Sequence, residues 1–186
     1  MTPHLLARLC ALGLVGVIVQ VSAVSQFGLF ATNPDLTPLI VASAAILLGS
    51  LPGACVGFAI GLFLDLALVQ TVGLSSLLYV AVGYWSGRLR ELRDPQGALI
   101  PIAVGAAATA VATIGYTLMQ FLLGVEAPVS LVLAREILAT IVLNALIALP
   151  VHALVRRWLV PALPEDPRRR RRRAYTTGGL SPLSRG

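Results

Sequence analysis

Six apolar segments follow one another along the chain and are separated by short polar or proline-containing breaks. They lie at about residues 5–25, 37–50, 53–69, 73–87, 98–123 and 131–155. Charged residues make up only 12% of the 186 residues, about half the usual share, and a water-soluble domain could not cover its surface with so few charges. In lipid an open chain satisfies its backbone hydrogen bonds only as helix. The sequence therefore predicts an all-α integral membrane protein with six transmembrane helices.

The number of crossings depends on the second, third and fourth segments, which are shorter than the ~20 residues of a full span. A five-helix alternative joins residues 39–68 into one long helix kinked near Pro52. With six crossings and a cytoplasmic N-terminus, every arginine except Arg135 falls in the N-terminus, the 88–97 loop or the C-terminal region. The positive-inside rule therefore favours six crossings, with both termini cytoplasmic in a multi-pass protein of the plasma membrane.

A transmembrane domain over residues 1–157 and a basic tail over residues 158–186 form the expected domain organisation. The tail is rich in Pro, Gly and Ser and has no apolar face, which predicts a disordered cytoplasmic segment. It contains a run of six arginines: Arg168, Arg169, Arg170, Arg171, Arg172 and Arg173. We expect them to bind anionic lipid, at about 1 kcal/mol per residue near the surface, with a specific protein partner as the alternative. The basic charge belongs mainly to this tail, so it does not indicate a nucleic-acid interface.

The residue pattern does not indicate a catalytic, metal or cofactor site. The two cysteines lie inside apolar segments, and the two histidines, His4 and His152, lie far apart without a cluster of ligands. No nucleophile–base pair and no phosphate-binding loop is present. We therefore expect a protein that is not an enzyme and holds no metal or cofactor.

The stretch "PGACVGFAIGLFLD" carries Gly53, Gly57, Gly61 and Asp65 at steps of four residues. Residues four apart share one face of a helix, and a stripe of glycines lets a second membrane helix approach closely. A carboxylate in hydrocarbon costs at least about 2.5 kcal/mol, so Asp65 should face protein or water. Two roles stay open for it: a cap on the turn before the fourth helix, or an anchor that faces the bundle or a partner.

Similar ladders occur in the next two segments. Gly83 and Gly87 form a G-x-x-x-G pair in the fourth. Thr109, Thr113 and Thr117 follow one another at steps of four in the fifth, where each hydroxyl can bond to its own helix. Both patterns predict close helix packing.

Four more polar side chains stand inside or at the end of apolar segments: Gln20, Arg135, Glu136 and Asn144. An amide near the middle of the membrane needs hydrogen-bond partners. We expect Gln20, Glu136 and Asn144 to gather with Asp65 as polar anchors of the bundle or of a partner. Arg135 should point about 100° away from Glu136 around the sixth helix.

Residues 57–91, "GFAIGLFLDLALVQTVGLSSLLYVAVGYWSGRLRE", resemble the core signature of the MreD family of bacterial rod shape-determining membrane proteins. The matching residues are Gly61, Leu62, Asp65, Gly73, Leu74, Tyr79, Gly83, Tyr84, Gly87 and Arg88. Asn144 followed by Pro150 also fits the family, and the resemblance extends over about residues 5–157. The arginine tail is an extension that the family does not require.

The resemblance implies a non-enzymatic scaffold of the cell-elongation machinery in the bacterial plasma membrane. Family members bind MreC and act with MreB, RodA and its transpeptidase partner in lateral peptidoglycan synthesis. Their architecture is similar to that of the small six-helix substrate-binding subunits of energy-coupling-factor transporters, and a vitamin-uptake subunit is therefore the alternative function. Such a subunit needs an outward pocket, for which the candidate residues are Asp35, Asp65, Tyr116, Gln120, Glu126, Arg135 and Glu136. Aromatic residues make up only 6% of the chain, which is few for stacking a vitamin ring.

Overall fold

A computed structural model of the chain describes residues 3–27, 35–92, 99–124 and 131–163. The described residues form helices only: α1 (Pro3–Phe27), α2 (Leu36–Leu48), α3 (Ser50–Ala67), α4 (Leu74–Leu92), α5 (Leu99–Leu122) and α6 (Leu131–Leu159), followed by the 3₁₀ turn η1 (Val160–Ala162). The prediction of six helices is confirmed. The five-helix alternative is wrong because the chain breaks at Gly49, whose φ of +105° suits glycine and ends α2 before α3 begins.

Four of the helices, α1, α3, α5 and α6, are long and apolar enough to cross a membrane. The remaining two helices, α4 and α2, do not meet this description, the first because of its charged residues and the second because of its length. α4 has 19 residues but carries Arg88, Arg90 and Glu91 in its last turns. α2 has only 13 residues, which is about 20 Å at 1.5 Å per residue, against about 30 Å of hydrocarbon. The chain is a multi-pass membrane protein, and six full crossings remain a prediction.

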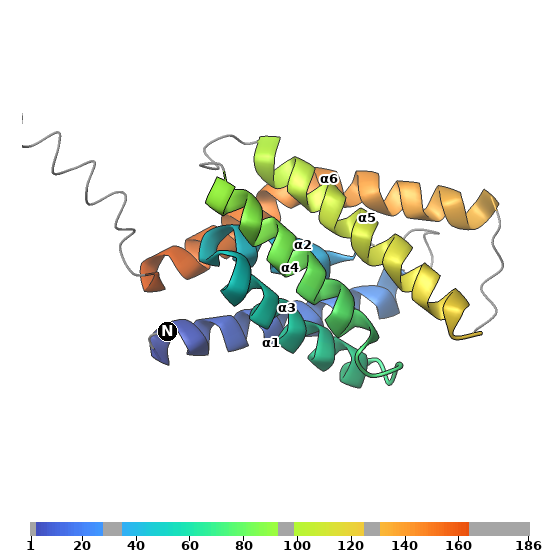
Figure 1. The fold of residues 1–186 in the computed structure, drawn as a ribbon, viewed down its shortest axis with the longest axis horizontal. Coiled ribbons are helices and arrows are strands. Elements are labelled where there is room, and N and C mark those ends of the chain that lie inside the picture. Colours follow the sequence, from blue (N-terminus) through green and yellow to red (C-terminus); the bar gives the residue numbers. More distant parts are fainter. Residues whose placement is uncertain (1–2, 28–34, 93–98, 125–130, 164–186) are drawn as a thin grey trace, which may run out of the picture.

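Successive helices run in alternating directions, so the bundle has two ends (Figure 1). The Glu91 end holds the start of α1, the break at Gly49, and the last turns of α4 and α6. The Asp65 end holds the turn between α3 and α4. At the Glu91 end, Arg8 Nη1 donates to the carbonyl oxygen of Trp158 at 2.9 Å, and Trp158 Nε1 donates to that of Arg8 at 3.4 Å. These bonds tie the first helix to the last.

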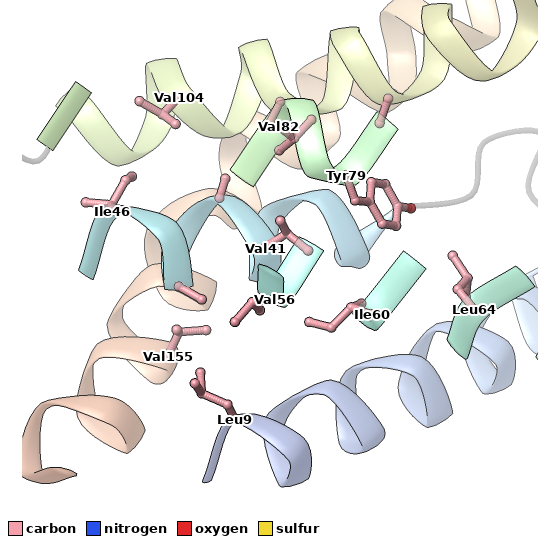
Figure 2. Close-up of a cluster of buried hydrophobic side chains, with 14 of the residues drawn as sticks. Leu9, Val41, Ile46, Val56, Ile60, Leu64, Tyr79, Val82, Val104 and Val155 are labelled. Carbon is pink, nitrogen blue, oxygen red and sulfur yellow. The ribbon is translucent and has the colours of Figure 1, made fainter. Parts of the chain in front are cut away.

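The shortest helix, α2, lies in the centre of the bundle and contacts all five others. Its Leu39, Val41 and Ala44 are buried, and the apolar core forms around them. Figure 2 shows side chains from every helix in this core, from Leu9 of α1 to Val155 of α6. Van der Waals contact among these side chains is what holds helices together when both protein and lipid are apolar.

A short helix inside a bundle leaves the backbone groups at its ends without water, so other groups must satisfy them. At the start of α2, the Gln20 side chain accepts a hydrogen bond from the Leu36 N–H at 2.8 Å. The Asp35 carboxylate accepts one from the Thr37 N–H at 3.3 Å. At the other end, the Arg90 guanidinium donates to the carbonyl oxygen of Leu47. Residues far apart in sequence therefore cap both ends of α2.

The start of α3 is capped from α4 as well. Glu91 Oε1 accepts hydrogen bonds from the Ser50 hydroxyl at 2.6 Å and from the Ser50 N–H at 3.1 Å. Arg88 pairs with the other carboxylate oxygen at 2.9 Å. These Ser50 and Arg88 contacts hold the pKa of Glu91 below its ordinary value.

Candidate functional site: a glycine seam and a polar cavity

The closest helix contact in the bundle is the one between α3 and α4, here called the glycine seam and made by Gly53, Gly57, Gly61, Gly83 and Gly87. A Cβ atom at Gly61 would lie 2.5 Å from the Cα of Ser76, and one at Gly57 would overlap the carbonyl oxygen of Tyr79. Real Cβ atoms do not come so close to backbone, so α3 tolerates only glycine at these two positions without a shift.

The opposite face of the glycine seam is built in the same way. A Cβ atom at Gly83 would overlap the carbonyl oxygen of Gly53, and one at Gly87 would overlap the carbonyl group of Gly49. The two helices therefore touch backbone to backbone from the Glu91 end to the α3–α4 turn. The structure brings all five glycines singled out in the sequence into one interface.

Asp65 lies one helical turn after Gly61, where the glycine seam meets the α3–α4 turn, and it is fully buried. Its carboxylate accepts hydrogen bonds from the Gly73 N–H at 2.8 Å and from the Ser75 N–H at 3.3 Å. Gly73 has a φ of +98°, so the turn itself needs a glycine. The carboxylate thus satisfies two backbone donors where α4 begins and closes the α3–α4 hairpin.

Asn144 and Gln20 hold the start of α2 from two sides. Asn144 is fully buried, and its Nδ2 donates to the carbonyl oxygen of Asp35 at 2.7 Å and to Thr109 Oγ1 at 3.0 Å. Gln20 comes from α1 and bonds to Leu36. Asn144 is about 20 Å along α6 from its first residue, so the start of α2 lies well inside the bundle.

The threonine ladder of α5 bonds to its own helix, which confirms the prediction for these hydroxyls. Thr109, Thr113 and Thr117 each donate to the carbonyl oxygen four residues earlier, at 2.8 to 2.9 Å. Thr109 differs from the other two because its oxygen also accepts from Asn144.

A hollow, here called the polar cavity, lies beyond the start of α2 and extends to the α3–α4 turn. Its volume is about 300 Å³. Its polar lining comes from Gln20, Asp35, Gln70, Ser75, Tyr79, Thr113, Tyr116, Thr117, Glu136 and Thr140, and apolar residues of α3 to α6 complete it. The described residues that line it include two carboxylates and no Lys, Arg or His. Asp35, directly before the first residue of α2, lines the cavity, whereas no residue of α2 itself does.

Arg135 does not join Glu136 in the polar cavity. It lines a separate apolar groove of about 530 Å³ on another side of α6, together with Leu138, Val142 and Leu146. The two neighbouring side chains therefore serve different faces of α6, as their angular separation around a helix requires.

The four polar residues expected to gather in one centre, Gln20, Asp65, Glu136 and Asn144, do not all meet there, whereas Arg135 points away from Glu136 as expected. Gln20 and Glu136 line the polar cavity, and Asn144 lies behind it through its bond to Asp35. Asp65 belongs to the hairpin turn, and Arg135 lies in the apolar groove. Of the outward groups considered for a transporter subunit, Asp35, Tyr116 and Glu136 line the cavity, whereas Gln120 is not among its lining residues. Glu126 and the arginines at 168–173 lie outside the described residues.

Sequence reasoning missed several residues that this geometry brings forward. Glu91 and Ser50 form the cap between α4 and α3, and Gln70 and Ser75 contribute to the cavity. A carboxylate at the end of "GRLRE" and a glutamine directly after an apolar helix are weak signals, because each fits an exposed loop equally well.

Comparison with known proteins identifies the family to which the chain belongs. The family model for MreD, described as rod shape-determining protein MreD, matches residues 5–158. The chain belongs to the MreD family. MreD proteins are non-enzymatic membrane proteins of rod shape determination, and the chain takes that role from its family. No curated protein and no solved structure matches it significantly.

Residues 57–91, on which the resemblance in the sequence was based, cover most of the α3–α4 hairpin. Their glycines form most of the glycine seam, their aspartate closes the turn, and their last residue caps α3. This part of the family match therefore includes the residues that allow α3 and α4 to touch along their backbones.

Proposed function

We propose that this MreD-family protein is a membrane scaffold of the bacterial elongation machinery that binds MreC. The other components of the assembly are MreB, RodA and the transpeptidase partner of RodA. Together they carry out lateral peptidoglycan synthesis. The observation that carries the proposal is the family match over residues 5–158, which includes the whole described bundle except its two ends. A scaffold needs a rigid frame, and backbone contact along α3 and α4 provides one.

The proposed orientation places the Glu91 end in the cytoplasm. Arg8, Arg88, Arg90, Arg156 and Arg157 lie near that end of the bundle, whereas Arg135 lies near the other. This asymmetry supports six crossings with cytoplasmic termini, because cytoplasmic ends of membrane helices carry the excess of basic residues. The arginine run at 168–173 would then meet the anionic inner leaflet, where it adds membrane attachment.

Co-purification with MreC tests the proposal. The tagged chain and MreC are produced together, extracted from membranes under mild conditions and purified through the tag on the chain. We expect MreC in the eluate with the native chain and with Ala59→Leu, a substitution on the exposed face of α3. We expect its loss with Gly57→Leu, which forces α3 from α4. A folded native chain that retains no MreC would contradict the proposal.

The transporter-type alternative has one observation in its favour, the polar cavity, which is lined by residues of α1, α3, α4, α5 and α6 together with Asp35 and the α3–α4 turn. Small-molecule sites occupy such hollows between helices. The same purification separates the two functions, because an uptake subunit would bring an ATPase module and a bound vitamin detectable by mass spectrometry. A shape-determining scaffold brings MreC and cell-wall synthases.

A further inference from the structure

The α3–α4 hairpin is shorter than the hydrocarbon core of a bilayer. Between Ser50 and Arg88 its only charged residue is Asp65, which is buried. From Ser50 to Ala67, α3 covers 17 positions, or about 26 Å. From Leu74 to Arg88, α4 covers 14 positions, or about 21 Å. The hydrocarbon core of a typical bilayer is about 30 Å thick, so the hairpin is about 4–9 Å too short.

Long basic side chains can extend a short helix by reaching outwards to the membrane interface. Those in the last turns of α4 bond back to the bundle instead. Arg88 Nη1 pairs with Glu91 at 2.9 Å, and the Arg90 guanidinium donates to the carbonyl oxygen of Leu47. Glu91 in turn accepts from the Ser50 hydroxyl at 2.6 Å. This polar cluster therefore marks the level of the interface at the Glu91 end of the hairpin.

The α3–α4 turn needs polar surroundings at its tip. The Asp65 carboxylate accepts from the N–H groups of Gly73 and Ser75. The N–H groups of Thr71 and Val72 make no hydrogen bond to a residue that the structure describes. Such groups are costly in hydrocarbon and are satisfied by water or lipid headgroups. The tip therefore belongs at the second interface, although the hairpin is too short for a bilayer of ordinary thickness.

The neighbouring helix α5 favours a thicker bilayer at the same end. It packs against α4, and its Tyr116 hydroxyl donates to the side-chain oxygen of Gln70 in the turn at 2.7 Å. Figure 1 shows α5 running past the α3–α4 turn. The exposed side chains on this last part of α5 are Leu118, Phe121 and Leu122. Their apolar surface favours hydrocarbon at and beyond the level of the turn.

The charges of α6 indicate the ordinary thickness on its own side of the bundle. Arg135 and Arg156 lie 21 positions apart, which is about 32 Å along the helix. Glu136, directly after Arg135, is the one acidic or basic residue between them. This separation matches the hydrocarbon core of about 30 Å, so α6 suits a bilayer that is not thinned.

Two sides of one bundle thus fit two thicknesses of bilayer. A bilayer accommodates a short apolar span by thinning locally, at a modest cost for each ångström. We propose that the bilayer is thinned along the α3–α4 hairpin and that phospholipids with short acyl chains gather there. The partner of the exposed faces of α3 and α4 is then a short-chain lipid, and the thinning is largest at the Asp65 end.

Two spin labels at the level of the turn test the thinning. In a chain with Cys10→Ala and Cys55→Ala, the nitroxide is attached at Val72→Cys or at Leu118→Cys. The native side chains are 59% and 53% exposed, and Leu118 follows Tyr116, which bonds to the turn. In dioleoylphosphatidylcholine vesicles the labels are exposed to oxygen, which concentrates in hydrocarbon, and to a water-soluble nickel chelate. We expect a nickel-to-oxygen collision ratio at least about fivefold higher at position 72.

Equal ratios at the two positions would overturn the inference, because a bilayer of uniform thickness places both labels at one depth. A higher ratio at position 118 would overturn it as well. The inference requires the chain to lie in a bilayer and does not depend on MreC. The co-purification and the spin-label measurement can therefore fail independently.

A second pair of probes tests which lipids gather. In a chain with Trp85→Phe and Trp158→Phe, a single tryptophan is placed on α4 by Leu77→Trp or on α5 by Ile114→Trp. The two sites are 59% and 53% exposed and lie at one level, because Leu78 packs against Gly115.

The vesicles contain equal amounts of dimyristoleoyl- and dierucoylphosphatidylcholine, of which one is brominated at a time so that it quenches tryptophan fluorescence. We expect the ratio of short-chain to long-chain quenching to be about twofold higher at position 77 than at position 114. An equal or lower ratio at position 77 would overturn the proposal that short-chain lipids gather along the hairpin.

Discussion

The glycine seam and the polar cavity lie next to each other at the Asp65 end of one bundle and are built by opposite means. The seam has almost no side chains, and its strength comes from backbone contact between α3 and α4. The cavity is a hollow lined by side chains of α1, α3, α4, α5 and α6 together with Asp35 and the α3–α4 turn.

The fold therefore requires the glycines of the seam, whereas it permits changes in most side chains that line the cavity. A larger side chain cannot enter the glycine seam without moving a helix, so its composition is dictated by packing. The cavity walls can change chemically without moving a helix, apart from the residues that also cap α2. Substitutions in the two regions should therefore differ in kind, and the following predictions run from the largest expected effect to the smallest.

Gly57→Leu should have the largest effect. Its Cβ alone would overlap the Tyr79 carbonyl oxygen, so the helices must separate, and we expect a loss of stability beyond about 3 kcal/mol. Thermal unfolding of the purified protein in detergent measures it. Ala59→Leu adds the same side chain to the exposed face of α3 and should unfold like the native protein. Equal stability of the two variants would show that the seam does not hold the bundle.

Asp65→Ala should have the next largest effect. It leaves the N–H groups of Gly73 and Ser75 without an acceptor in a buried turn, at a cost of about 1–3 kcal/mol. Asp65→Asn keeps one acceptor oxygen and should recover part of that loss. MreC co-purification should follow stability across these variants. Loss of MreC from a variant of native stability would make Asp65 a partner contact instead of a cap.

Asn144→Leu should cost less, because hydrogen bonds between membrane helices contribute about 0.6 kcal/mol on average and at most about 1.7 kcal/mol. It removes both bonds that tie α6 to Asp35 and Thr109. A double-mutant cycle with Thr109→Val isolates the second bond. Strict additivity of the two substitutions would contradict a direct Asn144–Thr109 interaction.

Thr113→Val should have the smallest effect, within about 0.5 kcal/mol. The Thr113 hydroxyl bonds to its own helix, whereas Thr109, one turn earlier, also serves α6. Unfolding measurements on Thr113→Val and Thr109→Val compare two threonines that differ mainly in the hydrogen bond to α6, which only Thr109 makes. A larger loss for Thr113→Val would mean that the wall of the polar cavity is as constrained as the glycine seam.

The same contrast explains what the sequence could predict. Apolar runs set the six helices, and glycines at steps of four identified the faces of α3 and α4, because local periodicity determines both. The cavity depends on where α2 begins in space and on which distant side chains reach that point. Asp35 and Asn144 are 109 positions apart in the chain, and no local pattern joins these two residues or links them to Gln20. Asp65 lies between these cases, since its position was evident and its role as a cap required the geometry of the turn.

Shape complementation tests the central claim most directly. A rod-shaped bacterium depleted of its own MreD is given this chain, and the length-to-width ratio of its cells is measured together with the amount of chain in the membrane. We expect rods with the native chain and with Ala59→Leu, and rounded cells with Gly57→Leu. Rounded cells with native chain that is inserted, folded and bound to the host MreC would contradict the central claim.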